Sequence, residues 1–251
     1  MDAAFPGRCG VLSLMHLFKD LIDLILPPLC CICKRRLKSE ENIICNDCYS
    51  RTRLIALPYC ERCGRPLPSP DIKVCHTCIT EQHPCSYIRG ASPYDGITEN
   101  LIILLKYNGK RGTAKTLGKL MTRVISKEDT YTNCEIIVPV PLHRTRKRER
   151  GYNQAELLGE KLSAELNLPL ISNALIRMRA TPSQTKLPSE KRQKNVKDAF
   201  AVNKRTAELI KDKTVLLVDD VMTTGATLNE CARTLLKGGV KEVLGIVCAI
   251  A

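Results

Sequence analysis

The segment Val215–Leu228, with the sequence VLLVDDVMTTGATL, restricts the possible folds of this chain more than any other segment. Its first four residues are apolar and partly β-branched, which indicates a buried strand, and a helical pattern starts near Ala226. Two adjacent carboxylates, Asp219 and Asp220, and a short loop rich in threonine and glycine lie between these elements. A strand, a polar loop and a helix in this order predict a ligand site at the carboxyl end of a sheet.

The residue types in this segment suit a phosphorylated sugar. Backbone N–H groups and hydroxyls of the loop can converge on a phosphate, helped by the positive end of the following helix. Gly225 lacks the Cβ that would hinder close approach, and the paired acids can accept hydrogen bonds from two vicinal ribose hydroxyls. The alternative is a buried strand that leads into a capped helix, with solvated aspartates. The candidate binding residues are Asp219, Asp220, Thr223, Thr224, Gly225, Ala226 and Thr227.

Eight of the fourteen cysteines form four Cys-x-x-Cys knuckles, and eleven residues separate each knuckle from the next. Two thiolates in a knuckle can hold one tetrahedral ion from a tight turn, and two knuckles complete a four-cysteine site. The even spacing predicts about two structural Zn²⁺ ions rather than a disulfide framework. Zinc thiolates indicate a reducing compartment, so we expect a cytoplasmic protein. The predicted ligands are Cys30, Cys33, Cys45, Cys48, Cys60, Cys63, Cys75 and Cys78.

The spacing leaves the pairing of the four knuckles open. One ion can be held by the first two knuckles and one by the last two, or the pairing can be cross-braced. Cys31 lies inside the first knuckle and could replace Cys30. Nearby residues that we expect to be bystanders are His76, His83 and Cys85.

The chain is expected to have three parts. Residues 10–28 are apolar but short and interrupted by charges, which predicts an amphipathic helix that ends at two prolines and not an integral membrane protein. Residues 29–84 form a double zinc ribbon with many turn formers and few apolar residues, so the metal should supply most of its folding free energy. Residues 85–251 alternate strand and helix patterns, which predicts a mainly parallel α/β sheet.

Sequence periodicity locates the elements of this last part. Strands are predicted over 87–94, 135–140, 170–176, 199–202, 215–219 and 243–249, and helices over 97–105, 114–125, 153–166 and 226–237. The strands over 135–140 and 215–219 deliver their loops to the same edge of the sheet, because parallel strands share one carboxyl edge.

The formal charge of +13 indicates anionic partners. The segment His143–Gln154 carries five arginines or lysines against one glutamate and follows the strand that ends in Val140. A charged segment is usually a solvated face, but this one should lie at the edge of the sheet beside Thr223–Thr227, where arginines suit a pyrophosphate. Nucleic acid would use the same residues. Arg177–Lys197 adds seven cationic residues against one glutamate and is predicted to be a lid above the site.

Three segments together resemble the type I phosphoribosyltransferases and, among them, the ComF family of competence-related proteins. They are VPVPLHRTRKRERGYNQAELL, LIRMRATPSQTKL with EKRQKNVKDAF, and VLLVDDVMTTGATL. Members of this family often carry a double zinc ribbon and a leading apolar helix, so the resemblance covers nearly the whole chain. It implies that Asp219 and Asp220 hold the ribose hydroxyls of phosphoribosyl pyrophosphate, and that Thr223–Thr227 holds its 5′-phosphate.

The resemblance implies pentosyl transfer, in which a nucleophile attacks the ribose while the bond from C1′ to pyrophosphate breaks. Mg²⁺ would bridge pyrophosphate and ribose oxygens, and the candidate catalytic residues Arg144, Arg148 and Arg150 would stabilise the leaving group. Transferases for 6-oxopurines typically have an acid at the position of Thr223, which argues against purine salvage. The acceptor stays unknown.

Two functions therefore stay open. The first is a phosphoribosyltransferase, and the second is a non-catalytic nucleic-acid- or protein-binding module that retains the sugar-phosphate pocket. The ComF resemblance implies a role in uptake or processing of single-stranded DNA, with a DNA-uptake helicase-like ATPase as a candidate partner of the zinc domain. With no Trp and three Phe, stacking platforms are scarce, so contact with DNA should be mostly electrostatic.

Overall fold

A computed structural model describes residues 27–81, 83–179 and 196–251 of the chain. By its internal contacts the chain divides into two compact units, Met1–Ser50 and Arg51–Ala251. The first unit holds the first two knuckles, and the second unit holds the other two together with the sheet. The predicted helix over 10–28 and most of the predicted lid lie outside the described residues. None of the helices in the described part of the chain has the length and apolar composition that crossing a bilayer requires.

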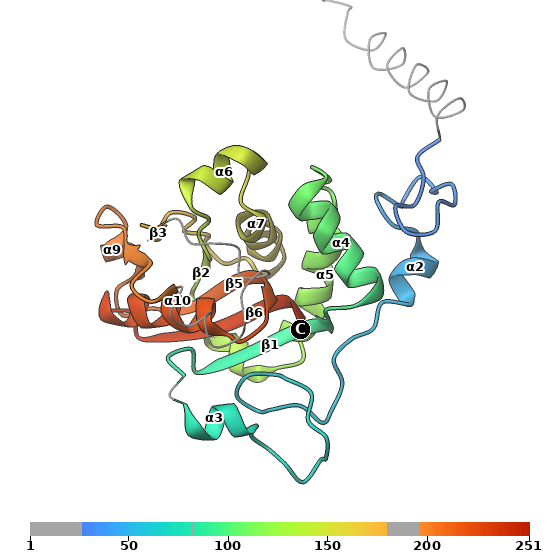
Figure 1. The fold of residues 1–251 in the computed structure, drawn as a ribbon. Helices are drawn as coiled ribbons and strands as arrows, with labels where there is room; N and C mark the ends of the chain where they lie inside the picture. Colours follow the sequence, from blue (N-terminus) through green and yellow to red (C-terminus); the bar gives the residue numbers. More distant parts are fainter. Residues whose placement is uncertain (1–26, 82, 180–195) are drawn as a thin grey trace, which may run out of the picture. The chain divides into compact units, whose positions relative to one another are not determined.

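The second unit is built on a parallel sheet of four strands in the order β1-β6-β5-β2 (Figure 1). The strands are β1 Tyr87–Pro93, β2 Ile136–Pro139, β5 Thr214–Met222 and β6 Glu242–Ile250. Their side chains are almost entirely buried, as expected for a parallel sheet with both faces covered. The predicted mainly parallel α/β fold is confirmed.

Helices connect the strands and cover the sheet (Figure 1). α4 Gly96–Tyr107 and α5 Thr113–Ile125 join β1 to β2, and α5 packs against α7 Gln154–Leu166. α10 Ala226–Lys237 joins β5 to β6 and buries Leu228, Cys231 and Leu235 against alternate residues of these strands. The shorter elements are α2 Asn46–Ser50, α3 His76–Thr80, η1 Asp129–Asn133, α6 Arg144–Arg150, β3 Leu175–Arg177, β4 Phe200–Val202 and α9 Ala207–Ile210.

Three segments differ from the sequence-based prediction. The basic segment after β2 is not an open loop, because His143 caps the helix α6 and Gly151, with φ of 78°, ends it. The strand expected over 170–176 is reduced to an isolated bridge at Leu170 and the short β3, which pairs antiparallel with β4. β5 continues through the two acids as far as Met222, because its pairing with β6 continues there.

The second zinc ribbon belongs to the core of the second unit. Cys60, Cys63 and Cys78 lie in one apolar cluster with residues of β5, β6 and α10, and Ile55, Leu67 and Val74 pack against that cluster. Apolar contacts with the sheet side therefore add to the contribution of the metal in this ribbon, and the expectation that metal supplies most of the folding free energy stays a prediction.

A buried arginine joins this ribbon to the first strand. Arg89 of β1 forms an ion pair with Glu128 at 3.0 Å and donates to the carbonyl of Glu61 at 3.0 Å. Its guanidinium lies 3.8 Å from the ring centre of Tyr87 and 4.8 Å from that of Tyr59. Arg89 itself is buried, so its removal should destabilise the protein by leaving the partly buried Glu128 carboxylate and the Glu61 carbonyl without their donor.

We predict that Arg89→Gln lowers the free energy of unfolding by about 3 kcal/mol, because it leaves the partly buried carboxylate of Glu128 without its cation. The matched control is Arg53→Gln, which removes an exposed ion pair with Asp95 at 2.9 Å and should cost less than about 1 kcal/mol. Urea unfolding of the zinc-loaded protein measures both. Equal losses in the two variants would contradict a structural role for the buried arginine.

Candidate functional site

A cavity lies at the carboxyl edge of the sheet, and the end of every strand contributes to its lining. Tyr94 follows β1, Val140 follows β2, Asp219 and Asp220 belong to β5, and Ala251 follows β6. The remaining lining residues are Lys106, Tyr107, Pro141, Leu142, Arg146, Arg150, Gln154, Arg177, Val221, Thr223 and Thr227. The loops that follow β2 and β5 therefore lie at one cavity, as expected because parallel strands share one carboxyl edge.

The two acids at the end of β5 are buried and differ in their surroundings. Asp220 forms an ion pair with Lys106 of α4, with Nζ and Oδ2 separated by 2.6 Å. Although burial opposes the charge of Lys106, the Asp220 carboxylate raises the pKa of this lysine above its ordinary value. Lys106 and Asp220 are therefore a charged, partly desolvated pair.

Asp219 is in none of the ion pairs recorded among the described residues, and its Oδ1 accepts the backbone N–H of Asp220 at 2.8 Å. Burial and the neighbouring negative charge of Asp220 raise the pKa of Asp219 to about 8. Both effects favour the protonated form of Asp219.

The turn after β5 leads directly into α10. Gly225 has a φ of 83°, and this left-handed backbone conformation explains why glycine is suited to the position. A Cβ at this position would make only ordinary contacts of 3.7 Å. The hydroxyl of Thr224 accepts the N–H of Ala226 at 3.3 Å, while Thr223 and Thr227 line the cavity. Thr224, Gly225 and Ala226 form the turn between the two lining threonines.

Arginines from two elements face the acids across the cavity. Arg146 and Arg150 of α6 line it, and Arg150 donates to Gln154 and lies 5.5 Å from the ring centre of Tyr107. Arg177 of β3 lines the cavity as well, and burial lowers its pKa. Of the candidate catalytic residues only Arg150 lines the cavity; Arg144 and Arg148 are exposed, and their catalytic role stays a prediction.

Lys106 is the most important residue that the sequence-based prediction missed. A signal was present, because Lys106 follows Ile102 by four residues and so lies on the apolar stripe of its helix. Its partner was not predictable, because the contact depends on how α4 crosses the sheet. Arg146 and Arg177 lie inside predicted basic segments, but only the orientation of α6 and β3 distinguishes them from their neighbours.

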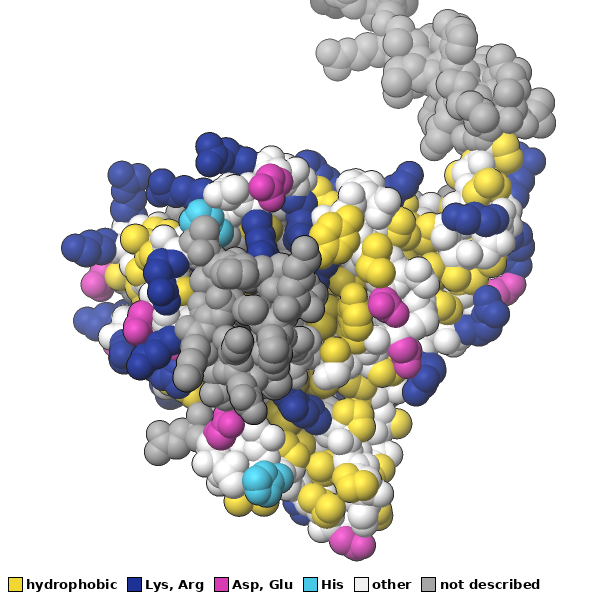
Figure 2. Space-filling view, viewed as in Figure 1, with side chains coloured by type: hydrophobic (Ala, Val, Ile, Leu, Met, Phe, Trp, Pro, Cys, Tyr) yellow, Lys and Arg dark blue, Asp and Glu magenta, His cyan; other side chains and the backbone are white. Residues whose placement is uncertain are grey.

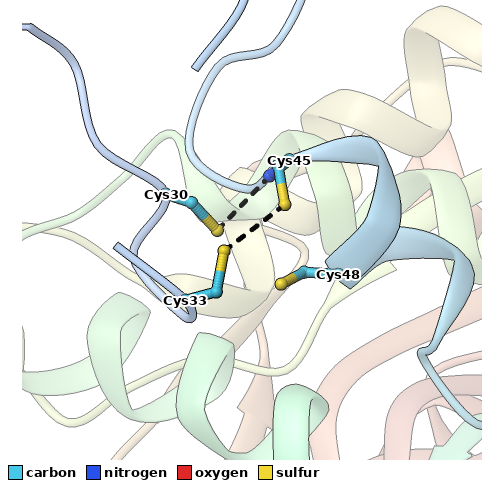
Figure 3. Close-up of side chains that lie close together, drawn as sticks. All are labelled: Cys30, Cys33, Cys45 and Cys48. Carbon is cyan, nitrogen blue, oxygen red and sulfur yellow. Dashed lines mark hydrogen bonds between the residues drawn. The ribbon is translucent and has the colours of Figure 1, made fainter. Parts of the chain in front are cut away.

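The four knuckles pair sequentially. The sulfurs of Cys30, Cys33, Cys45 and Cys48 point toward one another (Figure 3), and those of Cys60, Cys63, Cys75 and Cys78 converge in the same way. Within each set all sulfurs lie within 4.8 Å of one another, and Cys31, His76, His83 and Cys85 belong to neither set.

The geometry of each set fits a tetrahedral Zn²⁺. The shortest recorded sulfur separations are 3.6 Å between Cys33 and Cys45 and 3.7 Å between Cys63 and Cys75. Zn–S bonds of about 2.3 Å separate tetrahedral sulfurs by about 3.8 Å, whereas a disulfide needs about 2 Å. Backbone N–H groups also donate to Cys30 at 3.4 Å and to Cys60 at 3.3 Å, which favours the thiolate.

Comparisons with known proteins agree with this architecture. The double zinc ribbon domain family matches residues 21–79, and the phosphoribosyl transferase domain family matches residues 150–251. The chain is 31% identical over 223 residues to the DNA utilization protein YhgH of Escherichia coli K12, and this match covers 88% of the chain and 96% of that protein. The chain belongs to the ComF family.

Two further relatives of this ComF-family chain match parts of it. The chain is 38% identical over 148 residues to Competence protein F of Haemophilus influenzae, covering 57% of the chain and 63% of that protein. It is 36% identical over 111 residues to Competence protein ComFC of Bacillus subtilis, covering 41% of the chain and 39% of that protein. The double zinc ribbon and both four-cysteine sets support structural Zn²⁺, as predicted.

The raised pKa of Asp219 predicts how the stability of the ComF-family protein depends on pH. Below about pH 8 the folded state keeps a proton on Asp219, whereas the unfolded chain releases it near the ordinary value of 3.8. Wild-type stability should therefore fall as the pH rises between these values and level off above them. Asp219→Asn removes this loss, so it should raise the melting temperature more at pH 8 than at pH 5.

Thermal unfolding at the two pH values measures this difference. The control is Asp71→Asn, which changes an exposed aspartate of the second ribbon and should shift the melting temperature equally at both pH values. If Asp219→Asn behaved like this control, Asp219 would not be a protonated acid in the folded protein.

Proposed function

We propose that the second unit binds phosphoribosyl pyrophosphate in the cavity at the carboxyl edge of the sheet. Asp219 and Asp220 accept hydrogen bonds from the ribose hydroxyls, and the Thr223–Thr227 turn with the N-terminus of α10 holds the 5′-phosphate. Arg146, Arg150 and Arg177 face the pyrophosphate. The observation that carries the proposal is that one cavity brings together an acidic doublet, a hydroxyl-rich turn before a helix, and three guanidinium groups.

The chemistry that this arrangement supports is pentosyl transfer. The bond between C1′ and the pyrophosphate oxygen breaks and pyrophosphate leaves with the electron pair, while the acceptor forms a new bond to C1′ and loses a proton. The guanidinium groups stabilise the charge that develops on the leaving group. Mg²⁺ bound with the substrate would supply further neutralisation of the developing negative charge.

The proton on Asp219 bears on substrate binding. An ionised carboxylate can accept two hydroxyl hydrogen bonds, whereas a protonated one loses acceptor capacity. Loss of the proton from Asp219 would therefore complete the ribose site.

The alternative function is a nucleic-acid-binding module that retains the pocket. It is supported by α6, where Arg144, Lys147 and Arg148 are exposed and outside the cavity lining. Figure 2 shows Lys and Arg side chains at the surface in the upper left of the view, the part of the molecule where Figure 1 labels α6. We infer from the competence and DNA utilization proteins among the relatives that the protein acts on single-stranded DNA taken up into the cytoplasm. A helicase-like ATPase of DNA uptake is the proposed partner of the zinc domain.

Titration calorimetry with phosphoribosyl pyrophosphate and Mg²⁺ tests the binding proposal. Asp219→Asn combined with Asp220→Asn should abolish detectable binding and leave the fold intact, because the ribose loses both carboxyl groups as acceptors. Asp71→Asn is the control and should bind like the wild type. Unchanged affinity in the double variant would refute the assignment of the pocket.

Pyrophosphate-release assays over candidate acceptors, with the same proteins, separate the two functions. Release would support the transferase. Binding without release across nucleobase and nucleic-acid acceptors would favour the module without turnover.

The role of the exposed arginines on α6 gives a second test. Arg144→Gln with Arg148→Gln should weaken binding of single-stranded DNA and reduce the salt slope of the affinity by about 1.4, since each phosphate contact contributes about 0.7. Fluorescence anisotropy at several salt concentrations measures the slope. If these arginines act on pyrophosphate instead, as the sequence predicts, the variant would keep the slope and lose affinity for phosphoribosyl pyrophosphate.

A further inference from the structure

One side chain of the second zinc ribbon reaches the turn that is proposed to hold the phosphate. Arg65 follows the knuckle Cys60–Cys63, and its Nη2 donates to the backbone carbonyl of Thr223 at 2.5 Å. Within the described ranges no carboxylate forms an ion pair with Arg65. The partly buried guanidinium of Arg65 thus donates to the backbone carbonyl of the first residue of the Thr223–Thr227 turn.

The first ribbon shows that this contact is not required for building a ribbon. Both ribbons share their backbone hydrogen bonds at positions thirty residues apart: Cys30 donates to the Arg35 carbonyl at 2.8 Å, and Cys60 donates to the Arg65 carbonyl at 2.8 Å. Arg35 and Arg65 therefore occupy equivalent positions. Each ribbon also has the same antiparallel bridge, Leu29 with Arg36 and Tyr59 with Pro66.

The equivalent arginines have different partners. Arg35 stays within its own ribbon, where it pairs with Asp47 and lies 3.7 Å from Glu41. The position equivalent to Asp47 is Thr77, which has no charge to offer. The loss of this internal acid leaves Arg65 available to the Thr223 carbonyl.

The backbone beside Arg65 packs closely against strand β1. Lys34 and Gly64 are equivalent and both have left-handed φ angles, of 63° and 70°. A Cβ at Gly64 would lie 2.8 Å from the carbonyl oxygen of Ile88 in β1, so only glycine permits this close approach. Arg89 then binds the carbonyl of Glu61 from the strand side. Contacts on both sides of the knuckle thus fix the position from which Arg65 extends.

We infer that Arg65 is a positioning residue for the phosphate-binding turn, and that the second zinc site is the rigid base from which it acts. In a trans peptide the carbonyl and the next N–H point in opposite directions. Holding the Thr223 carbonyl toward the ribbon therefore fixes the direction of the Thr224 N–H, which points the opposite way within the same peptide plane. The consequence for affinity rests on the proposed function, whereas the consequence for the order of the turn does not.

The experiment compares Arg65→Gln with the matched variant Arg35→Gln in the full-length, zinc-loaded protein. Hydrogen exchange of the amides in residues 223–227 reports the order of the turn without any ligand, and calorimetry with phosphoribosyl pyrophosphate and Mg²⁺ reports binding. Arg65→Gln should speed this exchange about tenfold and weaken binding about tenfold or more, as expected for loss of a charge-assisted hydrogen bond. Arg35→Gln should change neither, and Arg65→Lys should recover part of both effects.

Metal analysis controls for loss of the ribbon, because both variants should keep about two zinc ions per chain. If Arg65→Gln lost zinc, the comparison of Arg65→Lys with Arg35→Lys would decide instead. Equal exchange and equal affinity in the Arg65 and Arg35 variants would overturn the inference. If the wild type did not bind phosphoribosyl pyrophosphate, the proposed function would fail, and the exchange of residues 223–227 would still decide whether Arg65 orders the turn.

Discussion

Two adjacent carboxylates are buried at the end of a central strand, and the rest of the site is arranged around their charge. Transferring two such charges from water into the protein is strongly unfavourable, so the fold must neutralise each of them. Lys106 does so for Asp220 by an ion pair, whereas burial and the neighbouring Asp220 raise the pKa of Asp219 and so favour its protonated form. A ligand that offers hydroxyl donors to these acids and phosphates to the surrounding arginines would compensate both sets of charges at once.

The parallel sheet is the reason that these groups meet. The carboxyl ends of β1, β2, β5 and β6 lie at one edge, so residues from distant parts of the sequence line a single cavity. α4 carries Lys106 to the acids from the connection after β1, and α6 carries Arg146 and Arg150 from the connection after β2. The site is therefore assembled by topology, and no single motif contains it.

The sequence was informative where local patterns determine structure. Four knuckles at even spacing predicted the zinc sets, and the apolar residues before Asp219 predicted β5 and the helix after it. It was uninformative where long-range contact decides the outcome. Helical spacing could have indicated that Lys106 lies on an apolar stripe, but its pairing with Asp220 depends on how α4 crosses the sheet. In the same way, spacing did not reveal that the second ribbon shares its core with β5 and α10.

The duplicated ribbons show how a metal site can acquire a second use. A four-cysteine site rigidifies a short segment that could not fold on a core of its own, and the same backbone then presents an arginine in a fixed direction. In the first ribbon internal acids neutralise that arginine. In the second ribbon Thr77 replaces the paired acid, and a glycine allows close contact with β1. Because metal and strand already hold the segment, ordering Arg65 against the Thr223 carbonyl costs little further conformational entropy.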